Sequence, residues 1–172
     1  MPEQRQGYET PAALVVREVV ADSAAATQAA GQALGAAVQP GQVIALRGNL
    51  GAGKTTFVQG LARGLGISAR VASPTFVLVN EYTSVSGVRL AHVDTYRLGV
   101  ASLDEAEGMG IGELLEDDAT IVAIEWADRV LELLPADILL VELEYGTGED
   151  QRFIRISALG PRSAAALQKI DF

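Results

Sequence analysis

The hydrophobic and polar positions in the first quarter of the chain predict a strand, a helix and a second strand. Residues 12–20 (AALVVREVV) and 42–47 (QVIALR) are short β-rich runs, which is typical of strands. Between them, residues 22–38 are rich in alanine. Asp22 or Ser23 can accept a hydrogen bond from the first turn, so either residue can cap a helix over this segment.

A second helix is predicted over residues 55–66 (TTFVQGLARGLG). Phe57, Leu61 and Leu65 fall along one face at helical spacing, and Gly66 is a stop signal. A glycine-rich segment lies between the second strand and this helix. The order is therefore strand, loop, helix, which is the order that a phosphate-binding loop requires.

The remainder of the chain predicts a β-hairpin that turns at Ser86-Gly87, a central strand and several short elements. Residues 119–126 (ATIVAIEW) are apolar on both faces, as expected of a strand covered by helices on both sides. The other predicted elements are strands at 76–83, 88–93, 138–145 and 152–158 and helices at 111–118, 127–134 and 161–170. We therefore expect an α/β sheet of mixed direction, with its site in the loop after the second strand.

Length and composition narrow the classes of protein. The chain has 172 residues, of which 49% are hydrophobic and 20% charged, so we expect one globular domain over residues 1–172. It has no cysteine and one histidine, His92, which excludes thiolate zinc sites, cysteine nucleophiles and histidine clusters. The net charge is −9, so the chain should repel phosphate backbones, and independent nucleic-acid binding is not expected.

The N-terminus predicts neither a leader nor an anchor. Residues 1–10 are polar and are expected to be a disordered extension, and no apolar stretch approaches the length that crosses a bilayer. A cytoplasmic protein without membrane association is the expectation.

The segment GNLGAGKTT, residues 48–56, matches the phosphate-loop pattern G-x-x-x-x-G-K-[ST]. Glycines permit the backbone conformations that turn several amides inward. Lys54 can reach β- and γ-phosphate oxygens, and the Thr55 hydroxyl can ligate Mg²⁺ at the start of the helix. The predicted nucleotide-binding residues in this loop are Gly48, Gly51, Ala52, Gly53, Lys54, Thr55 and Thr56. The alternative is a tight strand-to-helix turn with an exposed lysine.

The pattern leaves the fate of the nucleotide open. Guanine-specific proteins usually carry N-K-x-D, but neither Asn49 nor Asn80 is followed by lysine, so GTP is disfavoured. A small-molecule kinase usually has an arginine-rich lid, whereas no basic residue lies between Arg97 and Arg129. A kinase and an ATP-binding switch without productive turnover remain as alternatives to an ATPase.

Two carboxylates end predicted strands. Glu125 follows IVAI at the carboxyl end of a predicted strand, a position at which carboxylates contact Mg²⁺ or its bound water in such folds. The alternative is an ordinary charged residue at a strand end. Asp94 ends RLAHVD, where it either shares the metal and water chemistry or caps the next turn. Trp126 either closes the core or contacts the nucleotide site, and His92 is more typical of a structural histidine.

Thr75 lies in VASPTF, which suits a nucleotide-sensing loop, although Pro74 makes a simple turn an equal alternative. The arginines are scattered and none is an evident arginine finger. A hydrolase that is slow alone and needs a partner is therefore consistent with the sequence.

Four segments occur in the order GNLGAGKTTF, SPTFVLVNEY, HVDTYRL and IEWADR. Together they resemble the TsaE (YjeE) family of bacterial ATPases, which serve the threonylcarbamoyladenosine modification of ANN-decoding tRNAs. The similarity runs from about residue 19 to about residue 130. IEWADR lacks the proline that often follows the tryptophan, and the N-terminal extension has no recognised counterpart.

The resemblance implies a P-loop NTPase-like three-layer sandwich whose mixed sheet carries antiparallel additions. It also implies ATP and Mg²⁺ as ligands, partnership with TsaB and TsaD, and tRNA met indirectly through that complex. TsaD would perform the transfer chemistry. By position, Lys54, Asp94 and Glu125 are the implied catalytic residues, Thr55 and Glu125 the metal-associated ones, and Thr75 and Trp126 further nucleotide-site residues.

Overall fold

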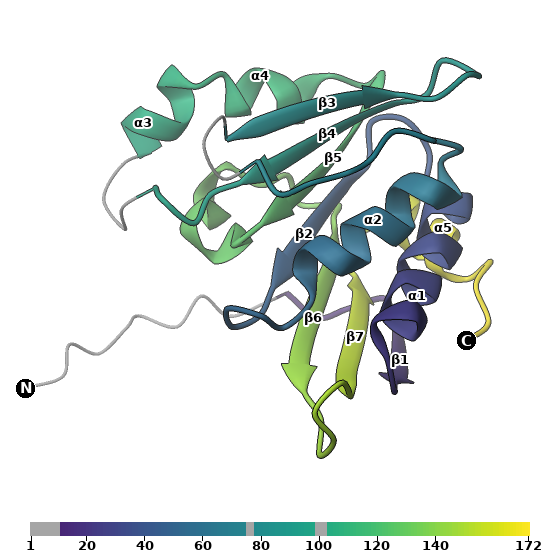
Figure 1. Ribbon diagram of the computed structural model, residues 1–172. Coiled ribbons are helices and arrows are strands. Elements are labelled where there is room, and N and C mark those ends of the chain that lie inside the picture. Colours follow the sequence, from purple (N-terminus) through teal and green to yellow (C-terminus); the bar gives the residue numbers. More distant parts are fainter. Residues whose placement is uncertain (1–10, 75–77, 99–102) are drawn as a thin grey trace, which may run out of the picture.

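The structure is a computed structural model that describes residues 11–74, 78–98 and 103–172. Its strands form one sheet in the order β1-β7-β6-β2-β5-β4-β3, with helices on both faces (Figure 1). The strands are β1 (Val15–Ala21), β2 (Val43–Arg47), β3 (Val79–Thr83), β4 (Arg89–Asp94), β5 (Thr120–Glu125), β6 (Leu139–Tyr145) and β7 (Arg152–Ala158). The helices are α1 (Ala24–Ala37), α2 (Lys54–Gly64), α3 (Leu103–Gly108), α4 (Ile111–Glu116) and α5 (Pro161–Leu167), with 3₁₀ turns η1 (Ala127–Arg129) and η2 (Leu131–Leu133).

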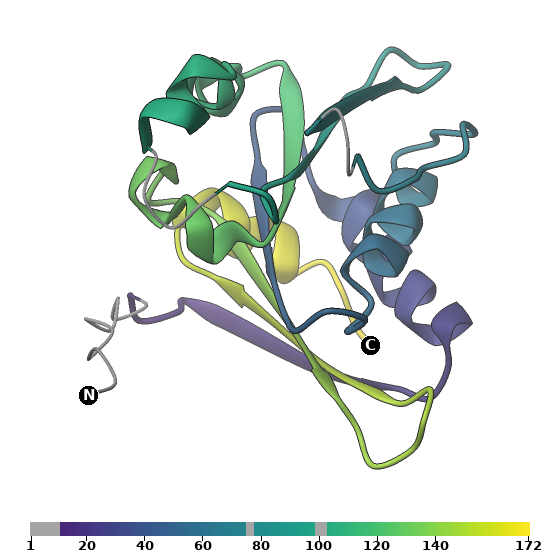
Figure 2. The same ribbon diagram turned by 60° about the vertical axis from the view of Figure 1, so that its left-hand side comes forward.

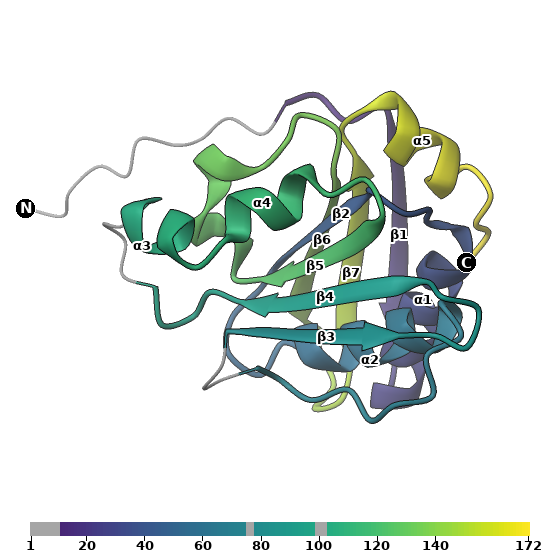
Figure 3. The same cartoon turned by 90° about the horizontal axis from the view of Figure 1, so that it is seen from above.

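The sheet combines a parallel centre with antiparallel edges, as predicted. β2 pairs in parallel with β5 and β6, and β4 pairs in parallel with β5. β3 is antiparallel to β4, and β7 is antiparallel to both β6 and β1. The sheet is strongly twisted, so that β3 and β4 run across the direction of β1 and β7 (Figure 3).

The alternation of side chains along the central strands explains the three layers. In β2, Ile44 and Leu46 belong to the core beneath α1, α2 and α5, whereas Val43 and Ala45 belong to the core beneath α3 and α4. Every residue of β5 is buried. Figure 2 shows α1 and α2 on one side of the sheet and α3 and α4 on the other. The prediction of a central strand covered on both faces is therefore confirmed.

Helices α1 and α2 pack backbone to backbone through glycines. A Cβ atom at Gly31 would lie 2.1 Å from the Phe57 carbonyl oxygen, and one at Gly60 would lie 1.9 Å from the Gln28 carbonyl oxygen. Gly35 and Gly64 are similarly tight, at 2.2 Å from Leu61 O and Gln32 O. Because α2 begins in the glycine-rich loop, this close packing helps to set the position of the loop.

The structure differs from the prediction after β5. Residues 127–134 form two 3₁₀ turns in place of one helix, because Trp126 reverses the chain at φ +58° and Pro135 keeps Leu134 extended, at ψ 137°. α3 was not expected. Of the two predicted N-caps of α1, Asp22 and Ser23, the structure uses Ser23, whose side chain accepts from Ala26 N. No helix in the described ranges is long and apolar enough to span a membrane.

Candidate active site

The glycine-rich loop joins β2 to α2 beside the ends of β5 and β4. The parallel register places Leu46 opposite Glu125, and Glu125 opposite Asp94. The strand ends surround a cavity of about 320 Å³ that is lined by Leu50, Gly51, Gly53, Lys54, Thr55, Thr56, Ser73, Asp94, Tyr96, Glu125 and Trp126. The loop, both predicted carboxylates and the tryptophan therefore meet at one place.

The loop depends on left-handed backbone conformations. Gly51 has φ +77° and Gly53 has φ +102°, a region that side chains disfavour. Gly48 is also constrained, since a Cβ atom there would lie 2.6 Å from the Leu143 carbonyl oxygen. Gly53 directly precedes the first residue of α2, so the loop leads into the positive end of a helix.

Lys54 is buried, with 4% of its surface exposed. Its Nζ donates to the carbonyl oxygens of Gly48 at 2.6 Å and Asn49 at 3.0 Å. It also lies 3.8 Å from the centre of the Trp126 ring. Burial lowers the pKa of Lys54, and the charges of Glu125 and Asp94 oppose this shift. The alternative of a tight strand-to-helix turn with an exposed lysine is therefore wrong.

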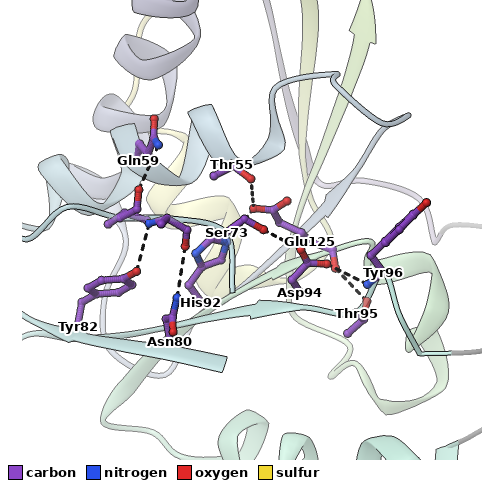
Figure 4. A network of polar contacts seen from close by, with 12 residues as sticks. Thr55, Gln59, Ser73, Asn80, Tyr82, His92, Asp94, Thr95, Tyr96 and Glu125 are labelled. Atoms are coloured by element: carbon purple, nitrogen blue, oxygen red, sulfur yellow. Dashed lines mark hydrogen bonds and ion pairs between the residues drawn. The ribbon is translucent and has the colours of Figure 1, made fainter. Parts of the chain in front are cut away.

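Glu125 is buried and is the junction of a polar network (Figure 4). Its Oε1 accepts from Thr55 Oγ1 at 2.8 Å and lies 2.8 Å from His92 Nε2. His92 is fully buried, and its Nδ1 has no hydrogen-bond partner among the described residues. A proton on Nε2 would let the ring donate to Glu125. The histidine expected to be structural thus contacts the site.

Asp94 caps a local turn and also lines the cavity. Its Oδ1 accepts from Tyr96 N at 2.9 Å, which is the capping role considered as an alternative. Its Oδ2 accepts from Ser73 Oγ at 2.9 Å, and both Asp94 and Ser73 line the cavity. The two interpretations of Asp94 are therefore compatible.

Trp126 has a backbone conformation that bulky residues rarely adopt, with φ +58°. The Thr95 hydroxyl holds this turn by contacting the carbonyl oxygens of Glu125 at 2.9 Å and Trp126 at 2.8 Å. The ring packs against Tyr96 at 4.9 Å between centroids, with the two ring planes tilted by 47°. The strained turn therefore places the indole over Lys54 and away from the core interior.

Not every predicted residue reaches the cavity. Thr56 lines it, but the Ala52 side chain belongs to the core beneath α1 and α2, so Ala52 can contribute through its backbone. Thr75 lies outside the described residues. Ser73 and Tyr96 were missed, although both stand within two residues of predicted site residues, in VASPTF and HVDTYR.

The oxygen donors fit Mg²⁺ in a site completed by phosphate. No group of three or more acidic or histidine side chains suitable for a metal occurs in the described part of the chain. Mg²⁺ commonly takes one or two protein oxygens and completes its shell with phosphates and water. Thr55 and Glu125 place a hydroxyl and a carboxylate 2.8 Å apart, which are donors of the kind that a hard cation prefers.

A family model described as "Threonylcarbamoyl adenosine biosynthesis protein TsaE" matches residues 21–154. The chain belongs to the TsaE family. It is 39% identical over 136 residues to the tRNA threonylcarbamoyladenosine biosynthesis protein TsaE of Bacillus subtilis, covering 79% of this chain and 82% of that protein. It is 40% identical over 144 residues to the protein of the same name from Aquifex aeolicus, covering 83% and 96%.

The TsaE family also accounts for the fold. The crystal structure of YdiB from Bacillus subtilis superposes with a TM-score of 0.75 at 31% sequence identity, covering 90% of this chain and 93% of that one. The predicted fold class and the predicted family are both confirmed. The matched residues 21–154 contain the loop, both carboxylates and the tryptophan.

Proposed function

We propose that this protein is a Mg²⁺-dependent ATPase that acts with TsaB and TsaD in the threonylcarbamoyladenosine modification of tRNA. Membership of the TsaE family supports the pathway. The observation that supports ATP as the ligand is the environment of the Lys54 ammonium group. This ammonium is buried behind a glycine-rich loop, and its contacts are neutral carbonyls and an indole ring.

A buried ammonium favours an anionic ligand. Its desolvation lowers the pKa of Lys54, and no carboxylate of the described chain lies within ion-pair distance of Nζ. A triphosphate would supply the missing negative charge beside this ammonium. The loop amides and the N-terminus of α2 add partial positive charge at the same place.

Thr55, Glu125 and Asp94 would have separate roles in ATP hydrolysis. Thr55 and Glu125 would hold Mg²⁺, which when bound neutralises charge on phosphate oxygens. Asp94, held by Ser73 and Tyr96 N, would orient the water that attacks the γ-phosphorus as the bond to ADP breaks. No covalent intermediate is required, since positioning and charge neutralisation suffice.

The site also supports slow turnover in isolation. No arginine is among the described residues that line the cavity. Arg129 lies 5.9 Å from the centre of the Trp126 ring, and its Nη1 donates to the Leu98 carbonyl oxygen at 2.6 Å. Because an arginine is a common stabiliser of charge in phosphoryl transfer, we propose that full activity requires the TsaB and TsaD partners, which would also hold the tRNA.

The matched test uses the two lysines of the chain. Lys54→Ala and Glu125→Ala should each remove most ATP hydrolysis, measured as phosphate release with Mg²⁺ and with or without TsaB and TsaD. Lys169→Ala makes the same change at an exposed lysine and should keep wild-type activity. Equal melting temperatures would show that all variants are folded. Full activity in Lys54→Ala or Glu125→Ala would refute the proposed ATPase.

A further inference from the structure

The hairpin formed by β6 and β7, the last two strands of the chain, contacts the glycine-rich loop. β6 ends at Tyr145 and β7 begins at Arg152, and the two residues are cross-strand partners. The hairpin projects at the same end of the sheet as the loop between β2 and α2 (Figure 1). Neither residue matches a nucleotide-binding pattern, and neither lines the cavity.

Tyr145 and Arg152 bind three consecutive carbonyl groups of the loop. The Tyr145 hydroxyl donates to the Leu50 carbonyl oxygen. Arg152 Nε donates to the Ala52 carbonyl oxygen at 3.1 Å, and its Nη2 donates to Gly51 O at 3.3 Å. Two side chains about a hundred positions downstream therefore fix the outer side of the loop.

The arginine is itself held in place. Its Nη1 donates to the carbonyl oxygens of Glu149 at 2.9 Å and Gln151 at 2.8 Å. Its guanidinium carbon lies 4.7 Å from the centre of the Tyr145 ring. All of these contacts are to neutral groups, so the guanidinium acts here as a rigid fork of donors.

Because of peptide geometry, the hydrogen bonds to these loop carbonyl groups also orient the amides on the inner side of the loop. In a trans peptide the carbonyl group and the following amide point in opposite directions. Binding Leu50 O and Ala52 O on the hairpin side therefore turns the amides of Gly51 and Gly53 the other way. Gly51 and Gly53 both line the cavity. A Cβ atom at Gly51 would lie 2.8 Å from the Tyr145 hydroxyl, so the glycine and the phenol fit one another.

We propose that Tyr145 and Arg152 are positioning residues that orient the amides of Gly51 and Gly53 toward the phosphates of the bound nucleotide. The inference rests on the proposed function for its ligand. It adds the C-terminal hairpin to the nucleotide site, although that hairpin carries no phosphate-binding pattern. The expected consequence is tighter binding through a preorganised loop.

The test compares the ATP dissociation constant of variants by calorimetry, which requires no turnover. Tyr145→Phe removes one hydroxyl and should weaken binding about 5-fold, because one hydrogen bond is lost. Arg152→Gln removes charged donors and should weaken it roughly 10-fold or more. Arg155→Gln is the matched control. It removes the same charge from the same strand, where Arg155 is exposed and lies 3.8 Å from Glu18, and it should bind within 2-fold of wild type.

A second measurement separates positioning from general stability. The order parameters of the Gly51 and Gly53 amides, measured by ¹⁵N relaxation without nucleotide, should fall in Tyr145→Phe while the melting temperature stays near that of wild type. Wild-type affinity and unchanged order parameters in both Tyr145→Phe and Arg152→Gln would overturn the inference. A wild-type protein that binds ATP with these variant effects but never hydrolyses it would overturn the ATPase proposal and support the anchor.

Discussion

One carboxylate oxygen of Glu125 contacts two other polar side chains of the site. Oε1 is 2.8 Å from both Thr55 Oγ1 and His92 Nε2, and Glu125 is 3% exposed. A buried carboxylate is costly unless donors surround it. Thr55 and Glu125 are also the proposed metal residues, so His92 is the donor that would remain with Glu125 if Thr55 turned to a metal.

Removing the His92 donor should therefore affect stability and activity together. We expect His92→Leu to lower the free energy of unfolding by about 1–3 kcal/mol, because a buried acceptor loses its partner, and to lower kcat for ATP. His92→Gln, whose amide can donate in place of Nε2, should recover part of both losses. Urea unfolding and steady-state phosphate release measure them. A kcat unchanged in His92→Leu would show that His92 is structural, as the sequence alone suggested.

The packing of α1 against α2 explains how the glycine-rich loop is held in position. In α1 and α2, glycines recur at intervals of four residues, at Gly31 and Gly35 and at Gly60 and Gly64. This spacing brings each pair to one helix face. The resulting contact has no room for a methyl group, so the position of α2, and with it the position of Lys54, follows from small residues.

The matched substitution distinguishes this contact from ordinary helix propensity. Gly60→Ala should lower the free energy of unfolding by about 1–3 kcal/mol, since the added methyl group meets the Gln28 backbone. Gly112→Ala, in α4, meets nothing within 4 Å and should raise stability by about 0.5–1 kcal/mol through helix propensity. Chemical denaturation of the two variants measures the contrast. Equal stabilisation by both changes would contradict the packing account.

The start of α5 depends on a distant carboxylate. Asp137 Oδ2 accepts from Arg162 N at 2.8 Å, and its Oδ1 accepts from Ser163 N at 3.0 Å. Burial alone would raise the pKa of Asp137, but the hydrogen bonds from Ser163 and Arg162 outweigh it and lower the pKa. Gly160 is the N-cap without a capping side chain, so Asp137 takes that role.

This cap should make stability depend on pH. Because the folded pKa of Asp137 is below its unfolded value of about 3.9, its contribution is complete above that value and is lost as the pH falls through the folded pKa. Asp137→Ala should cost about 1 kcal/mol at pH 7, and the difference from wild type should shrink below about pH 4. Asp171→Ala, at an exposed acid, is the control. A difference that stays constant with pH would exclude the capping charge.

Local patterns predicted most elements and the candidate site, but not the contacts between distant segments. The strand, glycine-rich loop and helix around Lys54 were readable because their signals are contiguous. The pairing of Tyr145 with Arg152, and their contact with the loop, depends on sheet order, which no local pattern encodes. The sequence predicts a helix where the structure has two 3₁₀ turns after β5, because the left-handed conformation of Trp126 is a tertiary effect held by Thr95.

The charge of the whole molecule differs from the local charge at the proposed nucleotide site. The net charge is −9, while Lys54 lies in the loop, Arg152 contacts the loop, and Arg63 and Arg70 line in part a second cavity of about 420 Å³. A small anion can enter a local positive site. A long polyanion must also approach the acidic surface, and it is repelled there.

The isolated protein should therefore bind ATP without binding tRNA. In filter-binding assays at low salt, where phosphate contacts are strongest, we expect no retention of tRNA by the protein alone and retention only when TsaB and TsaD are added. Arg63→Gln and Arg70→Gln are the informative variants, since they remove the positive charges of the second cavity. Salt-dependent retention of tRNA by the isolated wild type would contradict the prediction, and its loss in these variants would locate the contact. Such a result would mean that a local basic surface outweighs the acidic whole.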